Sequence, residues 1–181
     1  MIYVFLAEGF EEIEAVTPAD CLRRAGKTVQ TVGVGGKVIC GSHGIPVTAD
    51  ITGEELCLND ELEMIVLPGG MPGTRNLGKS AAVQKAIAFC NENDRWIAAI
   101  CAAPSILGAL GLLSGKKATC YPGFEPELTG CTALPVPAVR DGRFITGRGP
   151  GAAMDFALEL VTVLTDADTA KKLAGGMVYT K

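Results

Sequence analysis

The chain has 181 residues, of which 48% are hydrophobic and 20% are charged, and its net charge is −4. This length fits a single domain over residues 1–181 with a full core, and the composition excludes intrinsic disorder. A mildly acidic chain lacks the basic surface of a nucleic-acid binder. Its apolar stretches are shorter than the roughly 18 residues of a membrane span, and its first residues lack a signal-peptide pattern. We therefore expect a cytoplasmic protein with no nucleic-acid or membrane partner.

The first apolar run, residues 1–7, is predicted to be a buried strand. The helix predicted next, at 11–25, has acidic residues in its first turn and basic residues in its last turn, as the helix dipole favours. Further strands are predicted at 28–34, 38–40, 45–49, 64–67 and 96–100, with a hairpin at 139–145. Further helices are predicted at 80–91, from 102, at 152–164 and at 166–174. Apolar strands that alternate with helices predict an α/β fold, in which helices cover both faces of a mostly parallel sheet.

Seven cysteines are spread along the chain: Cys21, Cys40, Cys57, Cys90, Cys101, Cys120 and Cys131. Their number is odd, no two have the C-x-x-C spacing, and the chain has one histidine, so we expect no metal site. A compartment that keeps thiols reduced is the simplest setting, and most of these cysteines are expected in the core. The glycine run at 33–36 lacks the strand-helix context of a dinucleotide fingerprint, and no cofactor is expected.

Sites in open parallel sheets form beyond the carboxyl ends of the strands. Three predicted turns qualify, after Ala7, Leu67 and Ile100. The third places Cys101 directly after an apolar strand and before two alanines, the small neighbours that a sharp strand-to-helix elbow requires. A thiol at a helix N-terminus is expected to have a lowered pKa and to react as a thiolate. The alternative is that Cys101 is one more buried core thiol.

Two backbone N–H groups, those of Gly70 and Ala102, are candidates for an oxyanion hole beside this thiol. The alternative for Gly70 is a plain Gly-Gly turn. A Glu14 carboxyl pressed against a thiolate would stay protonated and donate a hydrogen bond to sulfur. Glu11 and Glu12 are expected to be solvated partners of the helix dipole.

The one histidine, His43, lies in a glycine-rich loop and is expected on the surface. We assign it no catalytic role, although it is the only possible partner for a Cys-His dyad.

Several short motifs, taken in order and with their spacing, resemble those of the ThiJ/PfpI (DJ-one) superfamily. They are EEIE at 11–14, Pro18, RRAG at 23–26, LPGG at 67–70, NL at 76–77, AAICA at 98–102 and RGPG at 148–151. The resemblance runs from residue 1 to about 164. It is to the branch that contains the Parkinson-disease-linked protein, which is described as a glyoxalase and protein deglycase.

The resemblance implies a flavodoxin-like three-layer sandwich, a homodimer and a cysteine nucleophile elbow. Cys101 matches the family's elbow cysteine and Glu14 the acid that forms a hydrogen bond with it. Gly70 and Ala102 match the backbone oxyanion positions.

Two departures from the family pattern limit what the resemblance implies. In the protease branch a histidine directly follows the cysteine, whereas this chain has Ala102, so peptidase activity is not expected. Members similar to the human protein have a histidine before a proline near the cysteine, where this chain has Tyr121 before Pro122. Tyr121 is a possible third group that can donate a hydrogen bond, but it is a poor base near pH 7.

The resemblance and the residues together give three hypotheses. The first is a cofactor-independent enzyme that acts on 2-oxoaldehydes, free or as adducts on glycated proteins, in defence against carbonyl and oxidative stress. The second is a redox sensor in which Cys101 is oxidised. The third is a stress-response chaperone or a purely structural dimer.

Overall fold

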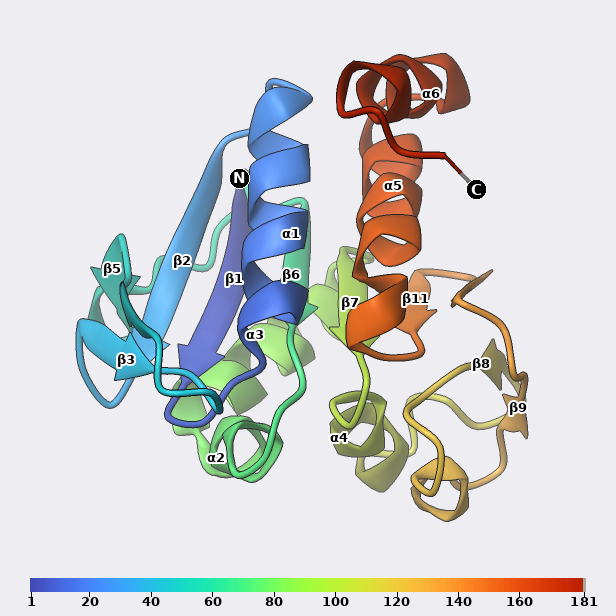
Figure 1. Ribbon diagram of the computed structural model, residues 1–181. Helices are drawn as coiled ribbons and strands as arrows, with labels where there is room; N and C mark the ends of the chain where they lie inside the picture. The colour runs from blue at the N-terminus through green and yellow to red at the C-terminus, as the bar shows by residue number, and fades with distance from the viewer. Residues whose placement is uncertain (181) are drawn as a thin grey trace.

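The computed structural model describes residues 1–180, which form a central sheet between two layers of helices (Figure 1). The sheet has seven strands in the order β10-β11-β7-β6-β1-β2-β5. These strands are β1 (Ile2–Ala7), β2 (Val29–Val34), β5 (Ile51–Thr52), β6 (Met64–Leu67), β7 (Trp96–Ile100), β10 (Ala138–Asp141) and β11 (Phe144–Gly147). All neighbours are parallel except β10 and β11, so the predicted flavodoxin-like α/β fold is confirmed.

The helices cover both faces of the sheet. One face carries α1 (Glu12–Arg24), α5 (Ala153–Leu164) and α6 (Ala167–Gly176), and the other carries α2 (Gly73–Lys79), α3 (Ala81–Glu92) and α4 (Pro104–Ala109). Strand β1 shows why two cores form, since Ile2, Val4 and Leu6 pack into the first and Tyr3, Phe5 and Ala7 into the second. Successive side chains of a strand point to opposite faces, so a strand buried on both faces is apolar throughout.

Some short elements were not predicted. Strand β5 and the parallel pair β8 (Lys117–Ala118) and β9 (Thr132–Ala133) have two residues each, too few to show a periodicity. Helix α2 has seven residues, of which two are glycine, the weakest helix former after proline. The short hairpin of β3 (Val38–Cys40) and β4 (Pro46–Thr48) was predicted and is confirmed.

The helix expected from residue 102 begins at Pro104 instead. Residues 101–103 form a turn in which the N–H of Ala103 donates to the carbonyl of Ile100 at 3.1 Å. Proline starts the helix because its fixed φ suits the first position and its missing N–H is not needed there. Within residues 1–180, no helix is long and apolar enough to span a membrane.

Candidate active site

The turn after β7 holds Cys101 in an unusual backbone conformation. Its φ is +65°, in the left-handed region that residues with a side chain rarely adopt. Two backbone hydrogen bonds fix the turn: the N–H of Cys101 donates to Gly147 at 2.9 Å, and the N–H of Tyr121 donates to the carbonyl of Cys101 at 2.8 Å. Such a conformation persists only where the surroundings hold it, and it is common at functional sites.

The loop after β6 packs its backbone directly on the thiol. A Cβ on Gly69 would lie 2.7 Å from Cys101 Cβ and 2.8 Å from Glu14 Oε2, so only glycine fits there. Gly70 has a φ of +87°, and a Cβ on it would meet the backbone of Gly9 at 2.6 Å. The N–H groups of Gly70 and Ala102 both form hydrogen bonds with the Cys101 sulfur.

Glu14 lies beside the thiol and is fully buried. The N–H of Gly69 donates to its Oε2 at 2.8 Å, and the carboxyl also forms a hydrogen bond with the Cys101 side chain. Its Oε1 is buried and has no hydrogen-bond partner within the described chain. A buried oxygen without a donor disfavours the charged form of the carboxyl.

The two groups titrate as a pair. Burial raises the pKa of Glu14 to about 7, and the charge of Glu11 adds to this effect, while the hydrogen bonds from Cys101 and Gly69 oppose it. Burial also raises the pKa of Cys101 to about 12, together with the charge and hydrogen bond of Glu14. Between these two values the pair holds one proton and one negative charge, which the sulfur and the carboxyl share.

The expected lowering of the pKa of Cys101 by a helix terminus is therefore wrong. The helix begins at Pro104, beyond the turn that holds the thiol. Burial and the neighbouring carboxylate outweigh the N–H groups of Gly70 and Ala102, which act in the opposite direction.

A cavity of about 490 Å³ opens over the thiol. All the predicted site residues except the buried Glu14 line it: Cys101, Ala102, Gly70 and Tyr121. Its other walls are Ile13, Met71, Phe124, Pro150, Glu11 and His43. Sequence reasoning assigned no role to the apolar ones. Met71 directly follows Gly70, and Phe124 closely follows Tyr121. A short distance in sequence from a predicted site residue could therefore have pointed to both of these cavity residues.

Tyr121 is placed at the rim of this cavity rather than in its floor. Its backbone supports the Cys101 turn, whereas its side chain is 47% exposed. The ring lies against Gly149, where a Cβ would come within 3.2 Å of it. Tyr121 can therefore reach a bound molecule, but its hydroxyl takes no part in the Cys101–Glu14 pair.

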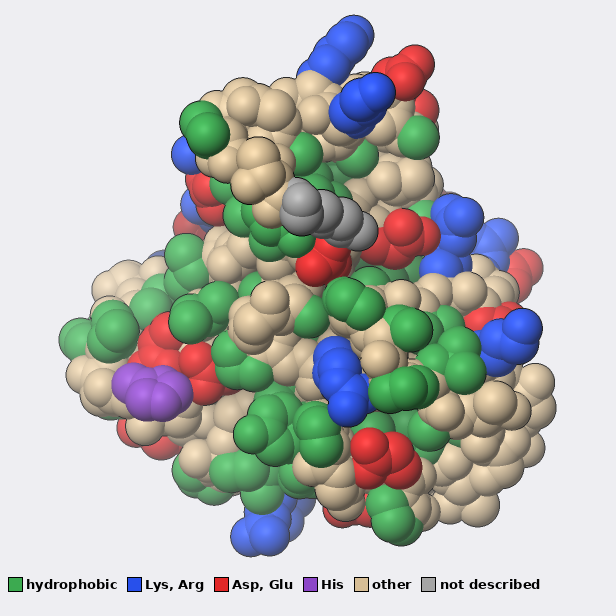
Figure 2. Space-filling model, turned by 45° about the vertical axis from the view of Figure 1, so that its right-hand side comes forward, with side chains coloured by type: hydrophobic (Ala, Val, Ile, Leu, Met, Phe, Trp, Pro, Cys, Tyr) green, Lys and Arg blue, Asp and Glu red, His purple; other side chains and the backbone are tan. Residues whose placement is uncertain are grey.

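Glu11 and Glu12 are buried, so the expectation that they are solvated is wrong. Glu12 binds the loop that carries His43: its Oε1 accepts from the His43 N–H at 2.8 Å, and its Oε2 lies 2.9 Å from His43 Nδ1. Burial acts to raise the pKa of Glu12, but the hydrogen bonds from His43 dominate and lower it to about 2. The same contact raises the pKa of His43. Figure 2 shows the histidine, in purple, against acidic side chains on the surface.

Glu11, Glu12 and His43 have side-chain atoms within 4.8 Å of one another, a spacing that a metal ion could bridge. The ion pair between His43 and Glu12 already accounts for their proximity. We therefore treat this cluster as the attachment of the 41–45 loop to α1.

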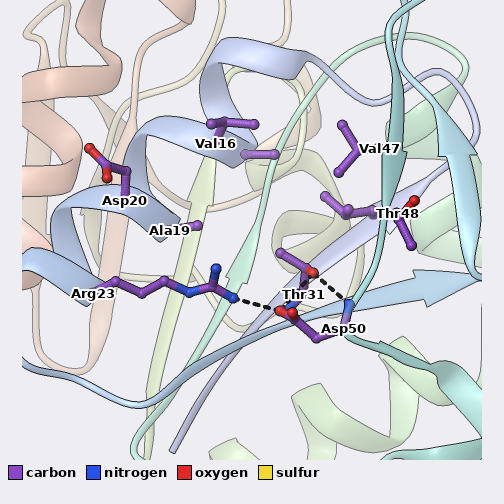
Figure 3. A pocket seen from close by; sticks show the side chains of 10 residues that line it. Val16, Ala19, Asp20, Arg23, Thr31, Val47, Thr48 and Asp50 are labelled. Atoms are coloured by element: carbon purple, nitrogen blue, oxygen red, sulfur yellow. Dashed lines mark hydrogen bonds and ion pairs between the residues drawn. The ribbon is translucent and has the colours of Figure 1, made fainter.

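A second cavity, of about 310 Å³, lies between α1 and β4 (Figure 3). Its polar groups pair with one another, since Asp50 Oδ2 lies close to Arg23 Nη2 at 2.6 Å and accepts from the N–H of Thr31 at 2.8 Å. Its lining residues include no cysteine and no histidine. The Cys101 cavity is thus the better candidate for chemistry.

Fold and site together define a flavodoxin-like α/β protein whose cysteine lies at a strained turn, at the carboxyl edge of a parallel sheet and beside a buried glutamate. The sequence profile of the DJ-1/PfpI family matches residues 1–163. The chain belongs to the DJ-1/PfpI family.

Three relatives and one solved structure support this assignment. Protein dj-1beta of Drosophila melanogaster is 36% identical over 97% of this chain and 95% of its own length. The Parkinson disease protein 7 homolog of Danio rerio is 35% identical, with the same coverage. A Pyrococcus abyssi protein named a deglycase is 32% identical over 90% of this chain and 98% of its own length. The solved structure of oxidized Toxoplasma gondii DJ-1 is 35% identical, has a TM-score of 0.94 and covers 99% of this chain and 98% of that one.

Proposed function

We propose that this chain is a cofactor-independent cysteine enzyme that acts on 2-oxoaldehydes such as methylglyoxal, free or as early adducts on proteins. The observation that carries this proposal is the pairing of Cys101 with the buried Glu14, whose pKa of about 7 suits proton transfer near neutral pH. A relative named a deglycase supports an enzymatic role in this family.

The first step forms a bond between sulfur and the aldehyde carbon. The Cys101 thiolate attacks while its proton resides on Glu14, and the aldehyde oxygen becomes the hydroxyl of a hemithioacetal. Hydrogen bonds from the N–H groups of Gly70 and Ala102 lower the pKa of Cys101, so these groups are near enough to the sulfur to stabilise negative charge on the neighbouring oxygen.

The second step moves hydrogen between the two substrate carbons. Glu14, as a carboxylate, removes the proton from the former aldehyde carbon, and the hydroxyl proton of that carbon passes to the former ketone oxygen, which gives an enediolate. Glu14 then returns its proton to the former ketone carbon, which leaves a thioester of a 2-hydroxy acid on Cys101. Hydrolysis by one water releases the acid and restores the thiol. One carbon is oxidised and its neighbour reduced, so no external oxidant is needed.

Lactate formation from methylglyoxal tests this proposal. We expect Cys101→Ser and Glu14→Gln to lower kcat/KM by at least about 100-fold, since each removes a group that acts in the chemical step. Cys57→Ser is the matched control, because Cys57 is an exposed thiol that does not line the Cys101 cavity, and this change is expected to leave turnover unchanged. Undiminished turnover in Cys101→Ser would exclude this mechanism.

A second candidate function is redox sensing through Cys101. The thiol lines an open cavity, and one relative of known structure is named as oxidized. Peroxide is then expected to oxidise Cys101 before Cys90, which is fully buried in α3 and serves as the internal reference. Equal oxidation of the two sites by mass spectrometry would remove the basis of this function.

A further inference from the structure

Two methionine sulfurs contact the thiol of Cys21 on the α1–α5 side of the sheet, in a cluster that the proposed chemistry does not use. The Sγ atom of Cys21 lies 3.8 Å from Met154 Sδ and 3.9 Å from Met177 Sδ. Cys21 belongs to α1, Met154 to α5, and Met177 directly follows α6. The fold alone brings these side chains together, because they come from three separate segments.

The distance from Cys21 to each methionine sulfur suits two ligands of one metal ion. Metal–sulfur bonds of about 2.3 Å place three ligands in one plane about 4 Å apart. Both distances from Cys21 are close to that value.

We propose that Cys21, Met154 and Met177 form a binding site for Cu(I). Thiolate and thioether sulfurs are soft ligands, which select this soft monovalent ion. Zinc is bound in proteins by cysteine, histidine and carboxylate ligands, so two thioethers disfavour it. The cluster is separate from the residues that line the Cys101 cavity.

The charge balance at the site also favours a monovalent ion. Cys21 is fully buried in the hydrophobic core on the α1–α5 side of the sheet. When Cu(I) binds, the S–H bond breaks, a sulfur–copper bond forms and the proton leaves to solvent. The thiolate and the cation neutralise each other, which avoids a net charge in the core. Copper is neither oxidised nor reduced in this step.

The cluster is accessible from the surface. Met154 and Met177 are only partly buried, and a cavity of about 460 Å³ beside Met177 is lined by Arg24 and Leu173 among others. A bound Cu(I) ion would link Met177, which follows α6, to Cys21 in α1 and Met154 in α5. We therefore expect Cu(I) to raise the Tm of the protein and to slow proteolysis at its C-terminal end.

The test is a titration of the reduced, metal-free, full-length protein with Cu(I) without oxygen, in competition with a Cu(I) chelator. We expect one tight site, with three sulfur ligands by X-ray absorption. Cys21→Ser should abolish it. Met154→Leu and Met177→Leu should each weaken binding by at least about tenfold, because even residues that only orient metal ligands have effects of this size. Leucine keeps the volume of methionine, so both variants should fold.

Met64→Leu is the matched control, since Met64 is a buried methionine of β6 and should leave Cu(I) affinity unchanged. Two outcomes would overturn the proposal. One is wild-type affinity in the double variant Met154→Leu/Met177→Leu, which would show that the three sulfurs only fill space. The other is complete loss of binding in Cys101→Ala, which would place the ion at the other cysteine.

Discussion

At the level of single residues, Cys101 and Glu14 hold one proton between them from about pH 7 to about pH 12. Neither group has its ordinary pKa, because each is buried and each raises or lowers the pKa of the other. Sequence reasoning could choose both residues, since one follows an apolar strand and the other lies in a motif. Their contact was expected only from the family resemblance, because it depends on the close packing of Gly69 against both side chains, and the sign of the thiol's pKa shift was not predicted.

The pH dependence of Cys101 alkylation by iodoacetamide tests the shared proton. We expect the rate in the wild type to rise with a midpoint near pH 7, where the pair gains its negative charge. In Glu14→Gln this midpoint should vanish, and the rate should rise in a single alkaline transition at a pH below the second transition of the wild type, because the charge of Glu14, which raises the pKa of Cys101, is absent. A wild-type profile without a transition near pH 7 would show that the charge stays on Glu14.

The pH dependence of stability provides a second test of the raised pKa of Glu14. Its pKa is about 7 in the folded protein against an ordinary value of 4.5, so between these values the folded state keeps a proton that the unfolded chain has released. The free energy of unfolding should therefore fall as pH rises through this range, by about 3 kcal/mol in total. Urea unfolding should show this fall in the wild type and not in Glu14→Gln.

Other titrating groups do not obscure this comparison. The raised pKa of Cys101 affects stability above about pH 9, and the lowered pKa of Glu12 affects it below about pH 4.5. The raised pKa of His43 has the same sign as that of Glu14 but is present in both proteins. Equal slopes in the two proteins would mean that Glu14 is charged in the folded state.

At the level of elements, the loop after β6 must approach both α1 and the Cys101 turn. Gly70→Ala places a Cβ at a φ of +87° and against the backbone of Gly9 and Glu11. Gly35→Ala is the matched control, because its φ is +90° but no atom lies within 4 Å of the added Cβ. Left-handed strain alone costs about 1–2 kcal/mol, and crowding adds about 1–3 kcal/mol. In denaturant unfolding, Gly70→Ala should therefore lose clearly more free energy of unfolding than Gly35→Ala. Equal losses in the two variants would show that the loop after β6 can move aside.

The elements also show which features a sequence reveals. The longer strands and helices were predicted because they show clear local patterns. Strand β1 is a continuous apolar run, and α1 has acidic residues in its first turn and basic residues in its last turn. Helix α2 and strand β5 were missed because tertiary contacts, and not local pattern, define them. The burial of Glu12 was missed for a related reason: its partner His43 lies in a distant loop that packs on α1 only in the fold.

At the level of the whole molecule, the surface of α1 indicates how two copies could meet, which the family resemblance also implies. Ile13 and Val16 are 53% and 51% exposed, and Val16 lines the cavity between α1 and β4 (Figure 3). Burying side chains of this kind contributes about 1.5–3 kcal/mol each. We propose a homodimer that uses this surface of α1.

Val16→Glu is expected to convert that dimer into a monomer, because it places a charge in the apolar contact. Leu110→Glu is the matched control, since Leu110 is 45% exposed at the end of α4, on the opposite side of the sheet. Light scattering after size exclusion gives the masses. Ile13 also lines the Cys101 cavity, so a partner seated on α1 would border the site, and the monomeric variant should turn over methylglyoxal more slowly. A monomeric wild type, or a Val16→Glu variant that stays dimeric, would show that this surface is not the interface.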